Sequence, residues 1–431
     1  MKLYFHVLGC PKNEADVAIA KGLAVSRGHT VVESLQDLGD DGIVVVYTCG
    51  FVEAAKRESI EEILTLAQEY RVIGVGCLVH RYFDELKREL REVDGLIGMV
   101  TPGHLVELLE RGIMFYKPLD PETIYVDTTR CPVTRVYEYV KIADGCSRKC
   151  SFCAIPFFKG AFRSRPMEVI VEEVRKLLDF GVKEIILVSQ DSTAFGVDLY
   201  GEPRLPELLG RLSRLSGDFW IRVMYLHPDH INDEIIDAIA LSDKVVPYFD
   251  LPVQHGSDKV LELMGRKKGR RELEKLVESI RLKNREAVIR STVMVGHPGE
   301  GEKEFLELLE FLDNCKFDRL GVFRYSEEEG TVSATLNEKV DENVASDRLE
   351  EVMKRQALIS SVRNKALLGR QFRVLVESRY NGVYIGRTYR DAPEVDGVVM
   401  VKANGKMEIG RFINARIVQC DDHDLEAVVV E

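Results

Sequence analysis

The chain is organised around one stretch, Ile142-Ala-Asp-Gly-Cys-Ser-Arg-Lys-Cys-Ser-Phe-Cys-Ala-Ile-Pro-Phe-Phe-Lys-Gly160, which follows an apolar run typical of a β-strand. This stretch holds Cys146, Cys150 and Cys153, three of the nine cysteines in 431 residues. Because the three thiols are close in sequence, they can converge on one metal centre without closing a long loop, so little chain entropy is lost. The spacing predicts a metal cluster at the end of a strand.

The number of ligands limits the kind of metal centre. A structural zinc site takes four protein ligands, commonly in two separated pairs, and no fourth Cys or His lies near this run. Bacterial ferredoxins add a fourth Cys that precedes Pro, which is also missing here. Three Cys on a four-iron cluster leave one iron open to another molecule, which indicates reaction chemistry. A zinc site and a buried structural cysteine cluster are the alternatives.

The N-terminal part, residues 1–118, alternates short apolar runs with segments of helical period, which predicts a flavodoxin-like, doubly wound parallel sheet in an α/β domain. Strands are expected over residues 2–8, 30–32, 42–47, 71–75 and 95–98, and helices over residues 13–27 and around residues 60–67.

Cys10, Cys49 and Cys77 follow the first, third and fourth of these strands, at the carboxyl ends where open α/β sheets bind ligands. With strand order 2-1-3-4-5 the three thiols would lie within roughly 10 Å of one another. A second cluster with three ligands is therefore expected. The alternative is that these are buried apolar cysteines, which are common in protein cores.

The rest of the chain divides into a linker and two more domains. Three prolines predict a linker over residues 119–131. In residues 132–365, apolar runs at 136–143, 183–189, 220–226, 245–251, 288–295 and 317–323 alternate with helical segments, which predicts a partial, laterally open (β/α)6 barrel and then a long helix from 342 to 368. Five short strands in residues 366–431 predict a small antiparallel β-barrel of OB-like type.

Composition narrows the class of protein. A net charge of −12 argues against a surface that tracks nucleic acid throughout. The sequence contains no run of about 18 apolar residues, so no membrane span is expected. The first residues are typical of a strand and not of a signal peptide. Nine cysteines without a signal sequence are typical of a reducing cytoplasm, so a cytoplasmic protein without a membrane partner is expected.

The C-x3-C-x-Phe-C loop resembles that of the radical S-adenosylmethionine (SAM) superfamily, in which the open iron chelates SAM. Over essentially its full length the chain resembles the methylthiotransferases, with an N-terminal cluster domain, a radical SAM barrel and a C-terminal TRAM domain. The motifs that carry this resemblance are Leu8-Gly-Cys-Pro-Lys-Asn13, Thr48-Cys49, Gly76-Cys77, Asp144-Gly-Cys146 through Arg163-Ser-Arg-Pro166, Leu251-Pro-Val-Gln-His-Gly-Ser257 and Val295-Gly-His-Pro-Gly-Glu300.

The resemblance implies two 4Fe-4S clusters, each with three Cys ligands and one open iron. Cys146, Cys150 and Cys153 would hold the cluster that binds SAM, and Cys10, Cys49 and Cys77 an auxiliary cluster that carries sulfur; no catalytic side chain is expected beyond these ligands. SAM would contact polar groups at the carboxyl ends of the barrel strands and an aromatic ring beside the cluster. These candidates are Phe152, Ser189, Gln190, Gln254, Arg290 and Thr292.

Two branches of the family differ in substrate. Cys-Pro-Lys-Asn and Pro-Val-Gln-His are similar to the branch that methylthiolates the β-carbon of an aspartate in small-subunit ribosomal protein twelve, which would be bound through the TRAM domain and the barrel mouth. The tRNA branch typically has Gly-Cys-Gln-Met-Asn and Gln-Ser-Gly-Ser. The C-terminal region has nine Lys and Arg against ten Asp and Glu, a poor match for RNA. The sulfur and electron donors stay open.

Two other functions are kept as alternatives. One is methylthiolation of a modified adenosine in tRNA, and the other, from a different class, is an iron–sulfur electron-transfer or scaffold protein. Among the remaining polar residues, His227 and His230 flank Pro228-Asp229 in a loop, where a surface or capping role is expected and contact with the substrate is the alternative. The acidic run of residues 327–329 is expected to face solvent.

Overall fold

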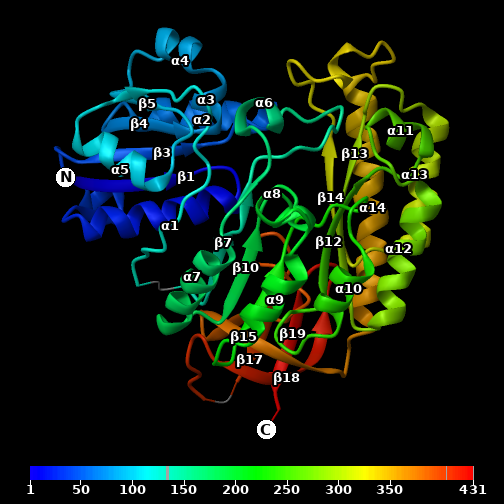
Figure 1. The fold of residues 1–431 in the computed structure, drawn as a ribbon. Coiled ribbons are helices and arrows are strands. Elements are labelled where there is room, and N and C mark those ends of the chain that lie inside the picture. Colours follow the sequence, from blue (N-terminus) through cyan, green and yellow to red (C-terminus); the bar gives the residue numbers. More distant parts are fainter. Residues whose placement is uncertain (133–134, 404, 431) are drawn as a thin grey trace.

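The computed structural model describes residues 1–132, 135–403 and 405–430. Figure 1 shows an N-terminal domain beside the upper end of a central barrel and a C-terminal barrel beneath it. In these described residues, no helix has the length and apolar character that a membrane crossing requires.

The N-terminal domain is a six-stranded parallel sheet in the order β2-β1-β3-β4-β5-β6. The predicted flavodoxin-like order is confirmed, and a short strand, β6, extends it at one edge. α1 and α5 cover one face of the sheet, and α2, α3 and α4 cover the other. The elements are β1 (Lys2–Val7), α1 (Pro11–Ser26), β2 (Thr30–Val32), β3 (Ile43–Thr48), α2 (Glu53–Leu66), β4 (Arg71–Gly76), α3 (Cys77–Arg81), α4 (Phe83–Glu89), β5 (Gly95–Ile97), α5 (Pro102–Glu110) and β6 (Phe115–Tyr116).

The central domain is the predicted open barrel of six parallel strands. They form two three-stranded sheets, β7-β10-β11 and β12-β13-β14, joined by one bridge between Ile221 and Val245. Within the described residues β7 and β14 do not pair, so one side stays open. The strands are β7 (Tyr137–Lys141), β10 (Glu184–Val188), β11 (Trp220–Val223), β12 (Tyr248–Gln254), β13 (Val288–Val295) and β14 (Arg319–Arg324).

Helices pack on the outside of these strands through a continuous apolar core. They are α7 (Met167–Asp179), α9 (Leu205–Ser213), α10 (Asp233–Ala240), α12 (Arg270–Lys283), α13 (Glu302–Cys315) and the long α14 (Glu342–Lys365). Shorter elements lie in the connecting loops: β8 (Ala143–Asp144), α6 (Ile155–Lys159), β9 (Arg163–Ser164), α8 (Val197–Tyr200) and α11 (Asp258–Leu263).

Three predicted strands of the barrel differ clearly from the structure, and one of them, 245–251, begins and ends three residues later as β12. The run 136–143 is divided, because β8 leaves the barrel and pairs antiparallel with β9 at the base of the cysteine loop. The run 220–226 ends at Val223, because Tyr225 has a left-handed backbone with φ of 62°, which a strand does not accommodate.

The C-terminal domain is a closed five-stranded barrel in the order β15-β16-β17-β19-β18. Its strands are β15 (Gln371–Tyr380), β16 (Val383–Arg387), β17 (Val399–Lys402), β18 (Phe412–Cys420) and β19 (Leu425–Val429). The predicted barrel is confirmed, except that β17 and β19 pair in parallel. This pair arises because β19 turns back from β18 and inserts between β18 and β17.

The C-terminal barrel closes the end of the central barrel at which the parallel strands begin. The Tyr137 hydroxyl at the start of β7 donates to Glu394 at 2.7 Å, and the Tyr248 hydroxyl at the start of β12 donates to Asp396 at 2.5 Å. Glu184, the first residue of β10, pairs with Arg387 at 2.6 Å. Access to the barrel interior is therefore left to the opposite end and the open side.

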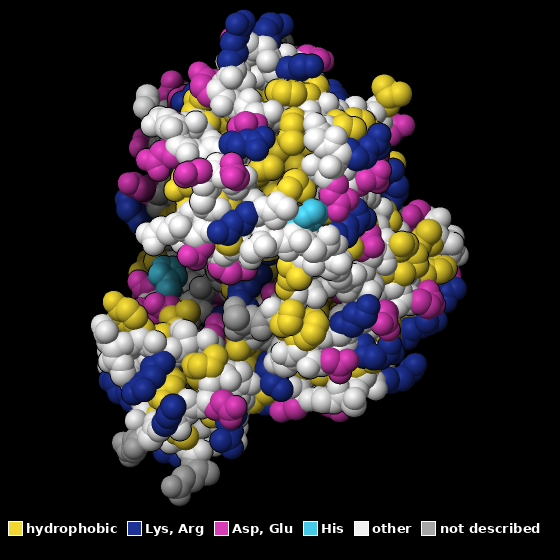
Figure 2. Space-filling model, turned by 90° about the vertical axis from the view of Figure 1, so that its left-hand side faces the viewer, with side chains coloured by type: hydrophobic (Ala, Val, Ile, Leu, Met, Phe, Trp, Pro, Cys, Tyr) yellow, Lys and Arg dark blue, Asp and Glu magenta, His cyan; other side chains and the backbone are white. Residues whose placement is uncertain are grey.

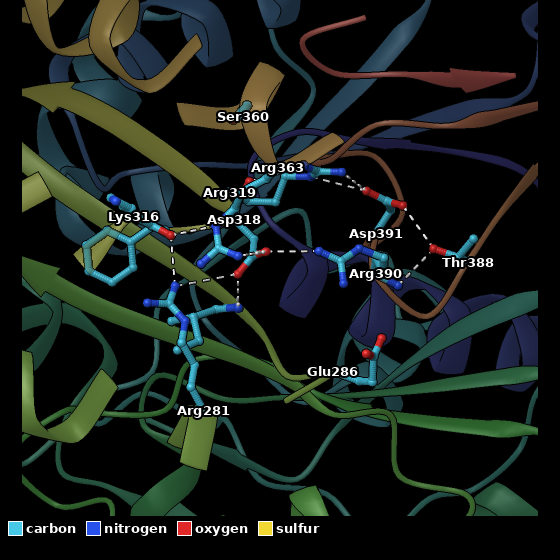
Figure 3. A network of polar contacts seen from close by, with 12 residues as sticks. Arg281, Glu286, Lys316, Asp318, Arg319, Ser360, Arg363, Thr388, Arg390 and Asp391 are labelled. Carbon is cyan, nitrogen blue, oxygen red and sulfur yellow. Dashed lines mark hydrogen bonds and ion pairs between the residues drawn. The ribbon is translucent and has the colours of Figure 1, made fainter. Parts of the chain in front are cut away.

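Asp318 is the centre of the polar network at this junction (Figure 3). Its carboxylate is buried, accepts from Arg390 of the C-terminal barrel at 2.9 Å, and lies 3.3 Å from Arg363 of α14 and 3.9 Å from Arg281 of α12. Burial, together with the neighbouring Arg363, lowers the pKa of Arg281. Three guanidinium groups from three parts of the chain therefore share this one carboxylate.

We expect Asp318→Ala to destabilise the junction by about 3 kcal/mol, because it leaves the buried Arg390 guanidinium without its anion. Asp313→Ala, which removes an exposed pair with Arg355, is the matched control and should cost at most about 1 kcal/mol. Limited proteolysis of the C-terminal barrel across a urea series measures both. Equal resistance of the two variants would contradict the central place of Asp318.

Candidate functional site

The loops that carry Cys10, Cys49 and Cys77 meet at the carboxyl edge of the N-terminal sheet. A Cβ built on Gly9 would lie 2.8 Å from the Cβ and 3.2 Å from the Sγ of Cys49. A Cβ on Gly50 would lie 3.0 Å from the carbonyl carbon of Cys77. Gly9 also has a φ of 97°, so this close approach requires glycine. The structure thus brings the three predicted thiols to one edge.

Asn13 holds two of these loops together. Its side-chain amide donates to the Leu8 carbonyl at 2.8 Å and to the Thr48 carbonyl at 3.2 Å. The Ser59 hydroxyl accepts the Cys49 N–H at 3.0 Å. The positions of the thiols are therefore set by hydrogen bonds that need no metal.

The other three cysteines lie in the loop between β8 and α6. The Arg148 N–H points at the Sγ of Cys146 at 3.4 Å, and the Cys153 N–H donates to the Cys150 carbonyl at 3.2 Å. Ser151 anchors the middle of this loop, because its N–H donates to the carbonyl at the end of α11 at 3.1 Å. The loop is thus attached to the barrel at its centre as well as its ends.

Four of the six thiols are less acidic than an exposed cysteine. Burial raises the pKa of Cys49 and Cys146, and it raises the pKa of Cys77 and Cys153 to about 12. Thiolate is the form that binds metal, so a metal must displace these protons.

The number of thiols in each trio limits the kind of metal centre that the trio can hold. In the described parts of the chain, no three His, Cys, Asp or Glu side chains are arranged to hold a single metal ion. In a four-iron cluster each Cys bonds a different iron, so its ligands stand further apart than those of one zinc ion. All six thiols are free. Each trio offers three sulfur ligands and no fourth, which is the donor set of a cluster with one open iron and not of a closed four-ligand zinc site.

A chain of buried charges joins the cysteine loop to the N-terminal domain. Asp144 is fully buried, and its carboxylate accepts from Lys159 at 3.0 Å and from Lys141 at 3.0 Å. Burial alone would raise the pKa of Asp144, but the two ammonium groups hold it well below its ordinary value. Lys141 also pairs with Asp16 of α1 at 2.6 Å. Neither trio of cysteines can therefore move without disturbing this network.

On the other side of the opening, the loop after β14 contacts the same domain. Glu328 is 2% exposed and accepts from Arg81 of α3 at 2.7 Å and from Lys56 of α2 at 3.1 Å. The N-terminal domain therefore spans the gap between β7 and β14 at the carboxyl end of the barrel. The expectation that residues 327–329 face solvent is wrong for Glu328, because its side chain turns into the domain interface, while both neighbours are exposed.

Three of the predicted SAM-contacting residues follow strands at this end. Ser189 is fully buried, and its hydroxyl is 3.0 Å from that of Ser192. The side-chain oxygen and nitrogen of Gln190 are both buried and have no hydrogen-bond partner in the described protein. Gln254 has a left-handed backbone with φ of 77°, which is rare for a residue with a side chain. Unmet hydrogen bonds and backbone strain thus gather at one end of the barrel.

The other candidates occupy two places. Arg290 and Thr292 lie on β13 beside Gly321, where a Cβ would be 3.6 Å from the guanidinium and 3.7 Å from the hydroxyl. Arg290 is already paired with Asp250 at 3.1 Å, so its charge is balanced within the protein. Phe152 is half-buried in the cysteine loop.

The histidines take structural positions. The His227 Nδ1 accepts the Asp229 N–H at 3.3 Å within the loop, and burial lowers the pKa of His227 to about 3. His255 lies 3.4 Å from Glu300, which also accepts from Arg348 of α14 at 2.9 Å. The motifs after β12 and β13 are therefore held together by one buried carboxylate.

Family models match each of the three domains. Residues 2–98 match the Uncharacterized protein family UPF0004, residues 140–312 the radical SAM superfamily, and residues 368–430 the TRAM domain.

Curated relatives match over the full length. The chain is 50% identical over 431 residues to the ribosomal protein uS12 methylthiotransferase RimO of Thermotoga sp. (strain RQ2), covering 99% of each chain. It is 49% identical to the protein of the same name from Thermotoga maritima and 48% identical to that from Fervidobacterium nodosum. The match to the Thermotoga maritima protein covers 100% of both chains. The match to the Fervidobacterium nodosum protein covers 100% of this chain and 99% of the relative.

Solved structures share the fold at low identity. The radical S-adenosylmethionine methyltransferase TsrM from Kitasatospora setae, with cobalamin and a 4Fe-4S cluster bound, superposes with a TM-score of 0.57 at 13% identity. The alignment covers 77% of this chain and 73% of that one.

We expect Glu328→Gln to loosen the N-terminal domain, because Arg81 and Lys56 lose a buried anion, with a local cost of about 3 kcal/mol. Hydrogen–deuterium exchange in α2 and α3 should rise accordingly. Glu329→Gln, one residue away and exposed, is the matched control and should leave exchange unchanged. If both variants exchange like the unaltered protein, Glu328 does not hold the two domains together.

Proposed function

Because the chain belongs to the ribosomal protein uS12 methylthiotransferase family, we propose that it adds a methylthio group to the β-carbon of an aspartate of uS12. The supporting observation is the match at about half identity along the whole chain. In addition, Cys77 of the N-terminal domain packs in one apolar cluster with Ala154 and Phe158, which follow the cysteine loop of the barrel. The radical SAM and TRAM domains agree with this assignment. A ribosomal substrate also implies a cytoplasmic enzyme.

Cys146, Cys150 and Cys153 are assigned to the cluster that binds SAM, and Cys10, Cys49 and Cys77 to an auxiliary cluster with an open iron. When bound, the clusters and two SAM molecules supply the electron, the radical that removes hydrogen from an unactivated carbon, and the methylthio group. The role of the protein in this assignment is to hold the two trios near each other. The packing of Cys77 with Phe158 and Ala154, which follow the loop of the second trio, supports it.

The SAM pocket is assigned to Ser189, Gln190 and Gln254, with Phe152 beside the cluster and Thr292 and Arg290 below. Gln190 is the strongest member, because a buried amide without a partner in the protein is costly unless a ligand supplies one. The strained backbone of Gln254 agrees, since strain of this kind gathers at binding sites. Arg290 forms the floor of the pocket.

The uS12 substrate is assigned to the open side of the barrel. The C-terminal barrel lies at one end of the strands and the cysteine loops at the other, so a protein that contacts both must extend along the side. Figure 2 shows the surface hollowed on the left of the view, between the upper part that holds the N-terminal domain and the lower part that holds the C-terminal barrel. The near-neutral charge of residues 370–431 favours a protein over RNA.

The substrate is tested by incubating the anaerobically reconstituted enzyme, SAM and a reductant with recombinant uS12 or with adenosine-modified tRNA. We expect the mass of a methylthio group on uS12 alone. The same label on tRNA alone would assign the chain to the other substrate. Failure to form 5′-deoxyadenosine at all would leave only an electron-transfer or scaffold role.

The two trios are tested by changing Cys10, Cys49 and Cys77 together to Ala. We expect iron to fall to about half, SAM cleavage to continue and methylthiolation to stop, because the auxiliary cluster has lost its ligands. Cys131→Ala with Cys420→Ala is the control, since these thiols belong to neither trio, and all three readouts should stay unchanged. Full iron content in the triple variant would refute the auxiliary cluster.

A further inference from the structure

Lys12 is a buried ammonium group that contacts no carboxylate in the part of the chain that the structure describes. It is 8% exposed, and its Nζ lies 3.4 Å from the Ser189 carbonyl oxygen and 3.9 Å from the centre of the Tyr225 ring. These contacts are its only polar partners in the described parts of the chain, and neither is a carboxylate. By contrast, Lys141 and Lys159 at the same interface both contact Asp144 at 3.0 Å. A buried charge is costly unless it is paired, so Lys12 is suited to bind an anion from outside.

The aromatic neighbour of Lys12, Tyr225, is fixed in place by hydrogen bonds to the barrel. Tyr225 keeps a φ of 62°, a strained conformation for an aromatic residue. Two hydrogen bonds maintain it, because its N–H donates to Asp250 at 2.9 Å and its carbonyl accepts the Ser192 N–H at 2.9 Å. This corner of the interface therefore has a cation and an aromatic wall.

The position of Lys12 relates this corner to the reaction. Lys12 is two residues from Cys10 at the start of α1, and its side chain crosses the interface to the ends of β10 and β11. An anion bound to its Nζ therefore lies between the N-terminal cysteines and the carboxyl end of the barrel. In an aspartate side chain, the carboxylate is attached directly to the β-carbon.

We propose that Lys12 binds the side-chain carboxylate of the aspartate in uS12 and so positions the β-carbon for methylthiolation. This assignment rests on the proposed function and adds to it the residue that recognises the substrate's charge. A charge-assisted hydrogen bond at a site shielded from water discriminates strongly, because the neutral amide of asparagine leaves the ammonium unpaired.

The test compares binding of two substrates by the reconstituted holoenzyme. Mass spectrometry of uS12 modified by the unaltered enzyme first identifies the aspartate, which is then changed to Asn. The Kd of fluorescently labelled uS12 and of this Asn form is measured by anisotropy. We expect the unaltered enzyme to favour the Asp form by a factor of about 30 or more, as for other buried charge pairs.

Variants of the enzyme then show whether the preference comes from Lys12. Lys12→Met should bind both forms equally, and Lys12→Arg, which keeps the charge, should retain part of the preference. Lys21→Met is the matched control on the same helix, because Lys21 pairs with the exposed Glu33 at 2.9 Å, and it should keep the full preference. The iron content of Lys12→Met should equal that of the unaltered enzyme.

Each other outcome is decisive. An undiminished Asp preference in Lys12→Met, or equal weakening of both substrates, would overturn the assignment while leaving the proposed function intact. Loss of iron from Lys12→Met would instead make Lys12 part of the cluster scaffold and would also overturn it. Absence of any methylthio group on uS12 with the unaltered enzyme would overturn the proposed function and this assignment together.

Discussion

The site depends on the buried ion pairs that dock the N-terminal sheet on the barrel. Asp144 lies between Lys159 and Lys141, and Lys141 reaches across to Asp16 of α1. Because removing one partner of a buried pair leaves an uncompensated charge, these contacts favour a single relative position of the two domains. Glu328 provides the corresponding constraint on the other side of the barrel opening. The two cysteine trios are thereby brought to one interface.

Parallel topology explains why the chemistry lies at this interface. In both the N-terminal sheet and the barrel, the cysteine loops follow the carboxyl ends of strands, where parallel sheets leave room for ligands. The opposite end of the barrel is closed by the C-terminal domain through Glu394, Arg387 and Asp396. A large substrate is therefore left with the open side of the barrel.

Buried polar groups differ between the scaffold and the site. At the junction with the C-terminal barrel, Asp318 is surrounded by guanidinium groups and its charge is balanced. At the carboxyl end of the barrel, Tyr225 and Gln254 have strained backbones. Among the residues that the structure describes, the Gln190 amide there has no hydrogen-bond partner and Lys12 contacts no carboxylate. A buried polar group without a partner and a strained backbone both raise the free energy of the folded protein. A bound ligand can lower that free energy by supplying the missing contact.

The sequence by itself determined the three-domain fold, the strand order of the N-terminal sheet and the six candidate thiols, because hydrophobic periodicity and close spacing are local properties of the chain. It did not indicate that Glu328 is buried, that β8 leaves the barrel to pair with β9, or that Lys12 points at Tyr225. Only the tertiary structure decided these features. Each depends on groups distant in sequence whose burial and pairing arise when the domains pack, and a charged side chain looks the same in sequence whether it faces water or a partner.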